Sequence, residues 1–354
     1  MHLSHLRKTA LAMVGAVALA GAALLAAAPA QAAASSPAAT AAAKAGWQTA
    51  ISHVSQPGTG CYQASYPSLS WHATACVAAP KILLVPAAAH ESAHHAGHIG
   101  PQTVGDGTDY SAVVSGLISK AVGTFADVSS GISEKGEGTT NSFSLQLNSQ
   151  FFSGSPACDD ASVPADCQAW QQFVYTYNSS DSGYIFMQYW LIDYNATCPS
   201  GWDSYSTDCY TNSNSTEVSE VTAKDLATVK LTASAVSGGN DGVSLSIGSG
   251  TASSVTGKDT KVDLASYWNT TEWGVFGNGG GSAADFGSDN TIEPTTALTS
   301  TSSGAPSCVS EGFTGETNNL KLAATAALGT ESSPTIASKQ TNGSAGTASC
   351  ATAS

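Results

Sequence analysis

The chain of 354 residues carries 12 Lys and Arg against 26 Asp and Glu, and its formal net charge at pH 7 is −14. A chain this acidic, without clusters of basic residues, lacks the surface that binds nucleic acid or an anionic membrane. We therefore expect neither of these partners.

The N-terminus has the pattern of a secretory signal peptide. The basic pair Arg7 and Lys8 precedes the apolar run 9–28, and the small-residue sequence 30–32 follows. This pattern predicts cleavage after Ala32 and export from the cell. Loss of the two cations takes the net charge from −14 to −16. No later apolar run reaches membrane length, so we expect a soluble, extracellular monomer without a membrane anchor.

Residues 33–103 are expected to form a leader in front of the main domain. Residues 33–45 are low-complexity Ala, Ser and Pro, which predicts disorder. A short segment with Trp47 and Trp71 follows, and it is too small to form a core of its own. Pro, Gly and His then dominate residues 86–103, as is typical of a linker. We interpret the whole segment as either a packed leader or a pro-segment that is removed.

The linker contains His90, Glu91 and His94 in the HExxH pattern of zinc metallopeptidases. That pattern binds zinc from a partly buried helix, because both histidines must lie on one helical face. Pro86 and Gly97 leave little room for such a helix, and few apolar residues are present to bury it. We interpret the motif as an exposed, His-bearing linker and expect no metal or other cofactor.

The eight cysteines of an exported chain are expected to form disulfides. The simplest pairing joins neighbours along the chain: Cys61 with Cys76, Cys158 with Cys167, Cys198 with Cys209, and Cys308 with Cys350. The first three bridges would close short loops, and the last would hold the C-terminal segment. No free thiol would remain.

Residues 104–354 are expected to form an all-β domain. Alternating, β-branched or aromatic segments recur between turns rich in Gly, Asn and Asp, and helical periodicity is nearly absent. The expected strands lie within residues 111–118, 142–151, 172–177, 184–194, 229–236, 243–247 and 261–264. Many short strands at regular spacing predict a single β-sandwich or jelly roll with disulfide-pinned loops, preceded by a flexible N-terminal leader.

Two of these strands combine aromatic residues with glutamines. The first, with the residues just before it (169–174), carries Gln171 and Gln172, and the second contains Tyr189 and Trp190. Adjacent strand residues face opposite sides of a sheet, so only one of the two glutamines can line a groove. The sequence leaves open which one it is.

Glu272 stands between two tryptophans, Trp268 and Trp273, in a segment after the expected strands. Glutamate is depleted from strands and costly to bury among aromatic rings. In a partly dry groove, desolvation would raise the pKa of this carboxyl and make it a usable acid or base. Alternatively, Glu272 is an ordinary exposed residue at a strand end.

Over about residues 104–335, this order of segments resembles the glutamic peptidases of the eqolisin type, secreted acid endopeptidases with a concanavalin-like jelly-roll β-sandwich. In that family a strand with the catalytic Gln precedes an aromatic strand, and the catalytic Glu follows before Asp-Phe-Gly, here residues 285–287. The resemblance implies that Glu272 takes a proton from water as the water attacks a peptide carbonyl, while Gln171 or Gln172 donates to the oxyanion. The candidate substrate-binding residues are then Tyr189, Trp190, Trp268 and Trp273.

The chain departs from these families in several places. The Trp-Val-Gly-Ile-Asp-Gly strand of the eqolisins is absent, and Thr271 replaces the small residue before the Glu. The strand at 142–151, followed by Trp170, is also similar to the neprosin-type relatives, but these use a pair of glutamates where this chain has Gln. The fold is therefore implied more directly than the active site.

Two other functions fit the same sequence. Flat rings such as Trp190, Trp202 and Trp273, together with many Asn and Asp residues, are typical of a sugar-binding face. They predict a lectin-like module whose partner is a glycan rather than an extracellular polypeptide. The other alternative is an inert structural or adhesin-like domain, in which most of these rings pack between the sheets.

Overall fold

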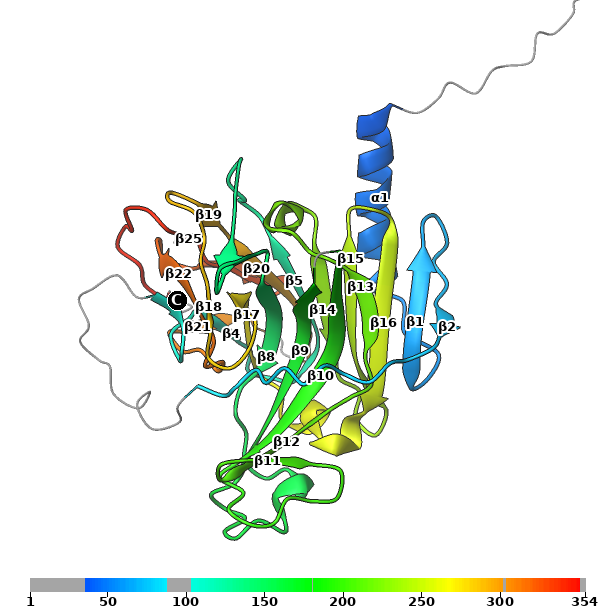
Figure 1. Ribbon diagram of the computed structural model, residues 1–354, viewed down its shortest axis with the longest axis vertical. Helices are drawn as coiled ribbons and strands as arrows, with labels where there is room; N and C mark the ends of the chain where they lie inside the picture. The colour runs from blue at the N-terminus through cyan, green and yellow to red at the C-terminus, as the bar shows by residue number, and fades with distance from the viewer. Residues whose placement is uncertain (1–35, 88–102, 180, 302–303, 351–354) are drawn as a thin grey trace, which may run out of the picture. The chain divides into compact units, whose positions relative to one another are not determined.

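The computed structural model describes residues 36–87, 103–179, 181–301 and 304–350 (Figure 1). Residues 37–354 form one unit, and its described part is built almost entirely of β-strands. The all-β class expected from the sequence is therefore confirmed. Two nine-stranded antiparallel sheets face each other, and a five-stranded sheet and a small hairpin complete the unit.

The first sheet has the strand order β2-β1-β16-β15-β14-β5-β20-β24-β23. The strands in that order are β2 (His72–Thr74), β1 (Gly60–Ser65), β16 (Thr251–Lys258), β15 (Asn240–Ile247), β14 (Lys230–Ser234), β5 (Ile118–Phe125), β20 (Pro294–Ser300), β24 (Ser333–Ala337) and β23 (Ala327–Thr330).

The second sheet has the order β11-β12-β10-β9-β8-β17-β4-β21, and β13 also pairs with β10. Its strands are β11 (Asp203–Tyr205), β12 (Asp208–Asn212), β10 (Ser182–Ile192), β9 (Gln168–Ser179), β8 (Phe143–Ser149), β17 (Thr270–Gly277), β4 (Ser111–Val113), β21 (Ser307–Val309) and β13 (Thr216–Ser219).

The remaining strands are short, and one longer helix precedes them in the chain. The third sheet holds β18 (Ala283–Ala284), β22 (Thr317–Leu322), β25 (Gln340–Thr341), β19 (Thr291–Ile292) and β3 (Thr103–Gly105), and the hairpin holds β6 (Lys135–Gly136) and β7 (Thr139–Thr140). The helices are α1 (Pro37–Ile51) and the 3₁₀ turns η2 (Pro156–Cys158), η3 (Ala223–Ala227), η4 (Asp259–Lys261) and η5 (Leu264–Ser266).

The main core lies between the two large sheets, and strand alternation fills it. In β8, every second residue, such as Leu145 and Leu147, points into this core and is fully buried. Leu231 and Val255 of the first sheet belong to the same cluster. Full burial of a side chain of this size contributes about 1.5–3 kcal/mol. The second sheet is also covered on its outer face, so the residues between these core positions are buried there as well.

Residues 37–87 are part of the sandwich, which differs from the disorder expected for 33–45 and from a sandwich starting at 104. The helix α1 begins at Pro37 because proline suits the first helical position and alanine has the highest helix propensity. Its buried Trp47 and Ile51 pack against Tyr62 of β1. β1 in turn pairs with β16 and extends the first sheet.

All four expected disulfides are confirmed, with Cα–Cα distances of 5.3–5.7 Å, and no cysteine is free. Disulfides form and persist in oxidising compartments, so the four bridges indicate an extracellular or similarly oxidising environment. Within the described part of the chain, no helix is long and apolar enough to cross a membrane. The expected signal peptide lies outside the described residues.

Candidate functional site

Five polar residues stand opposite one another on neighbouring strands of the second sheet. They face outward because strand alternation sends their neighbours, such as Leu147 and Phe173, into the main core. We call them the polar row; in order across the sheet they are Glu272 (β17), Asn148 (β8), Gln172 (β9), Gln188 (β10) and Asn212 (β12). The first four are completely buried.

Hydrogen bonds connect Glu272 with Gln172 through two intervening amides. Asn148 Nδ2 donates to Glu272 Oε2 at 2.8 Å and to Gln146 Oε1 at 3.1 Å. Gln146, two residues earlier on β8, also accepts from Gln172 Nε2 at 3.1 Å through the same oxygen. The candidate carboxyl and the candidate oxyanion donor therefore belong to one network on one face of the sheet.

Glu272 is held by three donors to a single oxygen. Besides Asn148, the backbone N–H groups of Phe313 and Thr314 donate to Oε2 at 3.1 and 3.2 Å. Its Oε1 has no hydrogen-bond partner in the described structure. Burial raises the pKa of Glu272 to about 7, the charge of Glu316 also raises it, and the three donors oppose the rise. A carboxyl with this pKa can exchange a proton near neutral pH.

Glu316 is a second buried carboxyl that the sequence did not point to. Its Oε2 accepts from Gln146 Nε2 at 3.3 Å and from the Thr314 hydroxyl. Burial raises its pKa, and these hydrogen bonds lower it. Glu316 follows a short loop that contains Gly312 and Gly315 and lies outside the alternating strand segments expected from the sequence, so no periodic pattern marks it. The same loop passes close to Glu272, since a Cβ added at Gly312 would lie 2.7 Å from Glu272 Oε1.

The structure separates the two candidate glutamines. Gln172 faces the polar row, whereas Gln171 points between the sheets and donates to Asp241 Oδ2 at 2.9 Å. Because successive residues of a strand point to opposite faces of the sheet, Gln171 would reach the outer face only if the pairing register of β9 shifted by one residue. Gln171 is therefore not part of the candidate site.

The aromatic candidates divide in the same way. Only Trp190 lies on the outer face, where its Nε1 donates to Gln172 Oε1 at 3.2 Å and to Gln188 Oε1 at 3.1 Å. The other three rings fill the main core instead of a groove: Tyr189, Trp268 against Phe173 at 5.6 Å, and Trp273 against Phe125 at 5.1 Å. The expectation that all four line a substrate site is thus not met.

A segment of the leader lies along the polar row. Residues 79–87, which we call the strap, follow β2 and cross the outer face of the second sheet (Figure 1). Its backbone is hydrogen-bonded to side chains of the sheet and to Glu316. Asn212 Nδ2 donates to Pro80 O (3.3 Å), and Gln188 Nε2 donates to Ile82 O (3.0 Å). The backbone N–H groups of Leu84 and Val85 donate to Gln188 Oε1 and Glu316 Oε1, each at 2.9 Å.

Apolar side chains form a wall on each side of the polar row. One wall contains Trp170, Trp190, Ile192 and Phe313, and Leu83 and Val85 of the strap pack against it. The other contains Val174 and Phe186, where Leu84 is fully buried beside Ile82. The polar row thus runs between two apolar strips that the strap covers, and we call this strap-binding face the groove.

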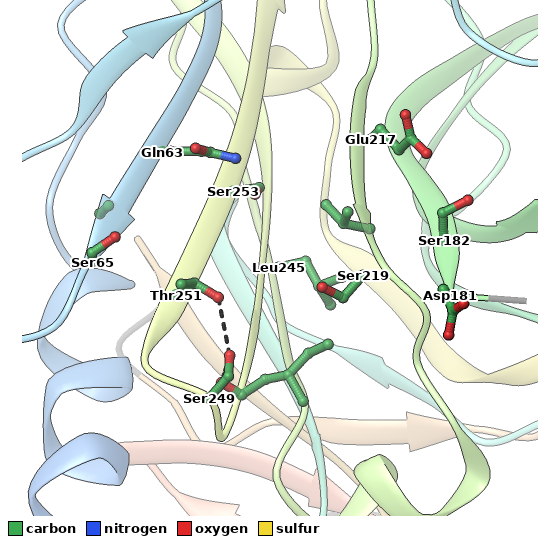
Figure 2. Close-up of a pocket in the computed structure, with 13 residues that line it drawn as sticks. Gln63, Ser65, Asp181, Ser182, Glu217, Ser219, Leu245, Ser249, Thr251 and Ser253 are labelled. Atoms are coloured by element: carbon green, nitrogen blue, oxygen red, sulfur yellow. Dashed lines mark hydrogen bonds between the residues drawn. The ribbon is translucent and has the colours of Figure 1, made fainter.

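A separate pocket of about 470 Å³ opens at the edge of the two large sheets (Figure 2). Figure 2 shows the carboxylates of Glu217 and Asp181 on one side of it and Gln63 on the other. The lining also includes hydroxyls such as Ser182, and none of its residues is aromatic or belongs to the polar row. This pocket therefore offers hydrogen bonds but no flat ring on which a sugar could stack.

Residues 36–87, 103–179, 181–301 and 304–350 contain no group of three or more His, Cys, Asp or Glu side chains that could hold a metal ion. His90, Glu91 and His94 lie outside the described residues.

Comparison with known proteins found no matching family model, no matching curated protein and no matching solved structure. The site is therefore interpreted from its own geometry.

Proposed function

We propose that this protein is a secreted peptide hydrolase that uses Glu272 and Gln172, with a concanavalin-like jelly-roll sandwich similar to that of the eqolisin-type glutamic peptidases. One observation carries the proposal. Gln172 and Glu272 face the same side of one sheet, in one hydrogen-bonded network, at a groove that already holds an extended peptide segment. The four disulfides and the signal-peptide pattern support secretion.

In this mechanism the ionised Glu272 removes a proton from a water molecule as the water oxygen attacks the peptide carbonyl carbon. The amide of Gln172 has two N–H groups, one of which donates to Gln146. The other donates to the oxyanion that develops on the carbonyl oxygen. When the C–N bond breaks, Glu272 returns the proton to the leaving nitrogen, which gives a carboxylic acid and an amine.

The surroundings of Gln172 keep its amide in a fixed orientation. Trp190 Nε1 donates to Gln172 Oε1, so this oxygen is identified as the acceptor end and Nε2 as the donor end. Gln146 fixes the donor end from the other side. A donor that is oriented before the reaction needs no reorganisation as the oxyanion forms.

The glycan-binding alternative has less support. Tyr189, Trp268 and Trp273 are buried in the main core, and Trp190 is covered in the groove, so these four present no ring to solvent. Of the other rings considered, Trp202 is only partly buried and packs against the main core. The groove also binds backbone N–H and C=O groups, which a polypeptide supplies at regular spacing.

Digestion of a denatured protein substrate between pH 3 and pH 8, with and without a chelator, tests the proposal. We expect cleavage that chelation does not affect and that falls about 100-fold or more in Glu272→Gln and Gln172→Ala, the usual scale for a lost acid–base group or oxyanion donor. The matched control is Glu217→Gln, which removes an exposed carboxylate in the separate pocket.

Absence of cleavage from both the intact chain and a chain with a loosened strap would overturn the peptidase proposal. Retention on a glycan column would then favour the lectin-like alternative. Cleavage that survives in Glu272→Gln, with an unchanged circular dichroism spectrum, would remove Glu272 from the mechanism.

A further inference from the structure

We infer that the strap is an intramolecular ligand of the groove, and that the substrates of this groove are extended peptides with a bulky aliphatic residue at the position of Leu84. The strap must leave before such a peptide can bind. This inference rests on the proposed function, because it names the substrate class and the regulation of the same site.

The groove holds the strap mainly through its backbone. In addition to the bonds from Gln188 and Glu316, three backbone hydrogen bonds join the strap to neighbouring loops. They are Ala87 N to Phe313 O (2.9 Å), Gly315 N to Val85 O (2.7 Å) and Gly280 N to Leu83 O (2.7 Å). Any extended peptide carries the same N–H and C=O groups, so another chain can make these contacts in place of the strap.

The strap follows the same antiparallel pattern that a bound peptide strand would use. Pro86 forms an isolated β-bridge with Thr314, antiparallel to it. Thr314 is also one of the residues whose N–H holds Glu272. The loop 313–315 therefore contacts the strap on one side and the candidate carboxyl on the other, which puts the occupied groove next to the proposed catalytic residue.

Selectivity comes from the alternate side chains. Leu84 is 0% exposed beside Val174 and Phe186, so this position has an apolar surrounding that excludes water. A charged or polar residue there would lose its hydration without gaining a partner. Lys81, by contrast, is exposed, so the groove places no such demand on that position.

The covalent link gives the strap an advantage over any free peptide. β1 is paired into the first sheet, and the Cys61–Cys76 disulfide ties the chain just before the strap. A segment tethered so close acts at an effective concentration in the millimolar range. Peptides at micromolar concentration displace it in only a small fraction of molecules, so the intact chain binds and cleaves substrate weakly.

Binding of a fluorescent synthetic peptide with the sequence of residues 79–87 tests the inference on the full-length protein. We expect saturable binding to Leu84→Asn that is at least ten-fold tighter than binding to the wild type, because the variant strap no longer fills its apolar site. The matched control Leu69→Asn changes an exposed leucine before the strap, 47% accessible, and should behave like the wild type. A peptide carrying the same Leu84→Asn change should not bind.

Equal binding to the wild type and to Leu84→Asn, or no binding to a Leu84→Asn protein whose circular dichroism spectrum is native, would overturn the inference. Hydrogen exchange on the wild type tests it without a variant. The amides of Leu84, Val85 and Ala87 should be protected, and exchange at the rates of an unstructured peptide would contradict the assigned contacts.

The two proposals fail in different ways. If Leu84→Asn binds the peptide but no variant cleaves protein, the groove assignment stands and the catalytic proposal fails. If cleavage is found but the peptide does not bind natively folded Leu84→Asn, the strap assignment fails while the catalytic proposal stands.

Discussion

Asn148 lies directly opposite Glu272 across β8 and β17, and its side-chain amide donates to the Glu272 carboxylate at 2.8 Å. The same amide reaches Gln146, which connects it to Gln172. A donor to a carboxylate favours the charged form, so Asn148 opposes the effect of burial on Glu272. Asn148 thus acts through Glu272 as a positioning residue.

Removing this donor should raise the pKa of Glu272 above its value of about 7. We expect Asn148→Leu, which keeps a similar volume without an N–H, to move the titration of this carboxyl upward. Infrared difference spectra of the carboxyl stretch, assigned by comparison with Glu272→Gln, would measure the shift independently of activity. Asn178→Leu, on an exposed part of β9, is the control. An unchanged titration in Asn148→Leu would contradict the assigned role.

The rise of cleavage activity with pH should follow the ionisation of Glu272, since a general base acts in its deprotonated form. While Glu272 is buried, its pKa of about 7 places this rise near neutral pH. Entry of water into an opened groove removes part of the desolvation, and the pKa should fall toward its usual value of 4.5. Initial rates from pH 3 to pH 8 should therefore rise at lower pH in Leu84→Asn than in the intact chain. Identical profiles would argue against a coupling between the strap and Glu272.

The sequence was sufficient for the fold class and the disulfides, because strand periodicity and cysteine order are local patterns. It was not sufficient to choose between Gln171 and Gln172, since both stand in one aromatic strand and only strand register decides which of them faces outward. It also did not identify Glu316 as part of the site, because its hydrogen-bond partners Gln146 and Val85 lie far away in the chain. The sequence also did not predict that residues 37–87 belong to the sandwich, because β1 becomes a strand of the first sheet only by pairing with β16, nearly 200 positions later.

The C-terminal disulfide should contribute more to stability than a short one. Cys308 and Cys350 are 42 residues apart, and the loop-entropy relation gives about 4 kcal/mol for a loop of this size. Cys158 and Cys167 are 9 residues apart, for which the relation gives about 3 kcal/mol. Urea unfolding of the two double Cys→Ala variants should therefore show the larger loss for the 308–350 pair. The opposite order would show that native packing around the bridges, rather than the unfolded chain, controls their effect.

Buried carboxyls should make the protein most stable in acid. Burial raises the pKa of Asp109, Asp241 and Glu316, and it raises the pKa of Glu134 to about 8. In the unfolded chain such groups titrate near pH 4. Between these values the folded state holds protons that the unfolded state has released, so the free energy of unfolding falls as pH rises. The stabilisation is fully present below about pH 4 and is lost as pH rises through the folded-state pKa values.

Thermal unfolding at pH 4 and pH 9 measures this effect, and we expect the lower melting temperature at pH 9. Each proton held by the folded state alone contributes a slope of about 1.4 kcal/mol per pH unit. Glu134→Gln removes one such group, because Glu134 is buried and its pKa is raised to about 8. This variant should unfold at a higher temperature than the wild type at pH 9, with little difference at pH 4. Glu217→Gln, an exposed control, should leave the pH dependence unchanged, and a wild type that becomes more stable from pH 4 to pH 9 would contradict the burial of these protons.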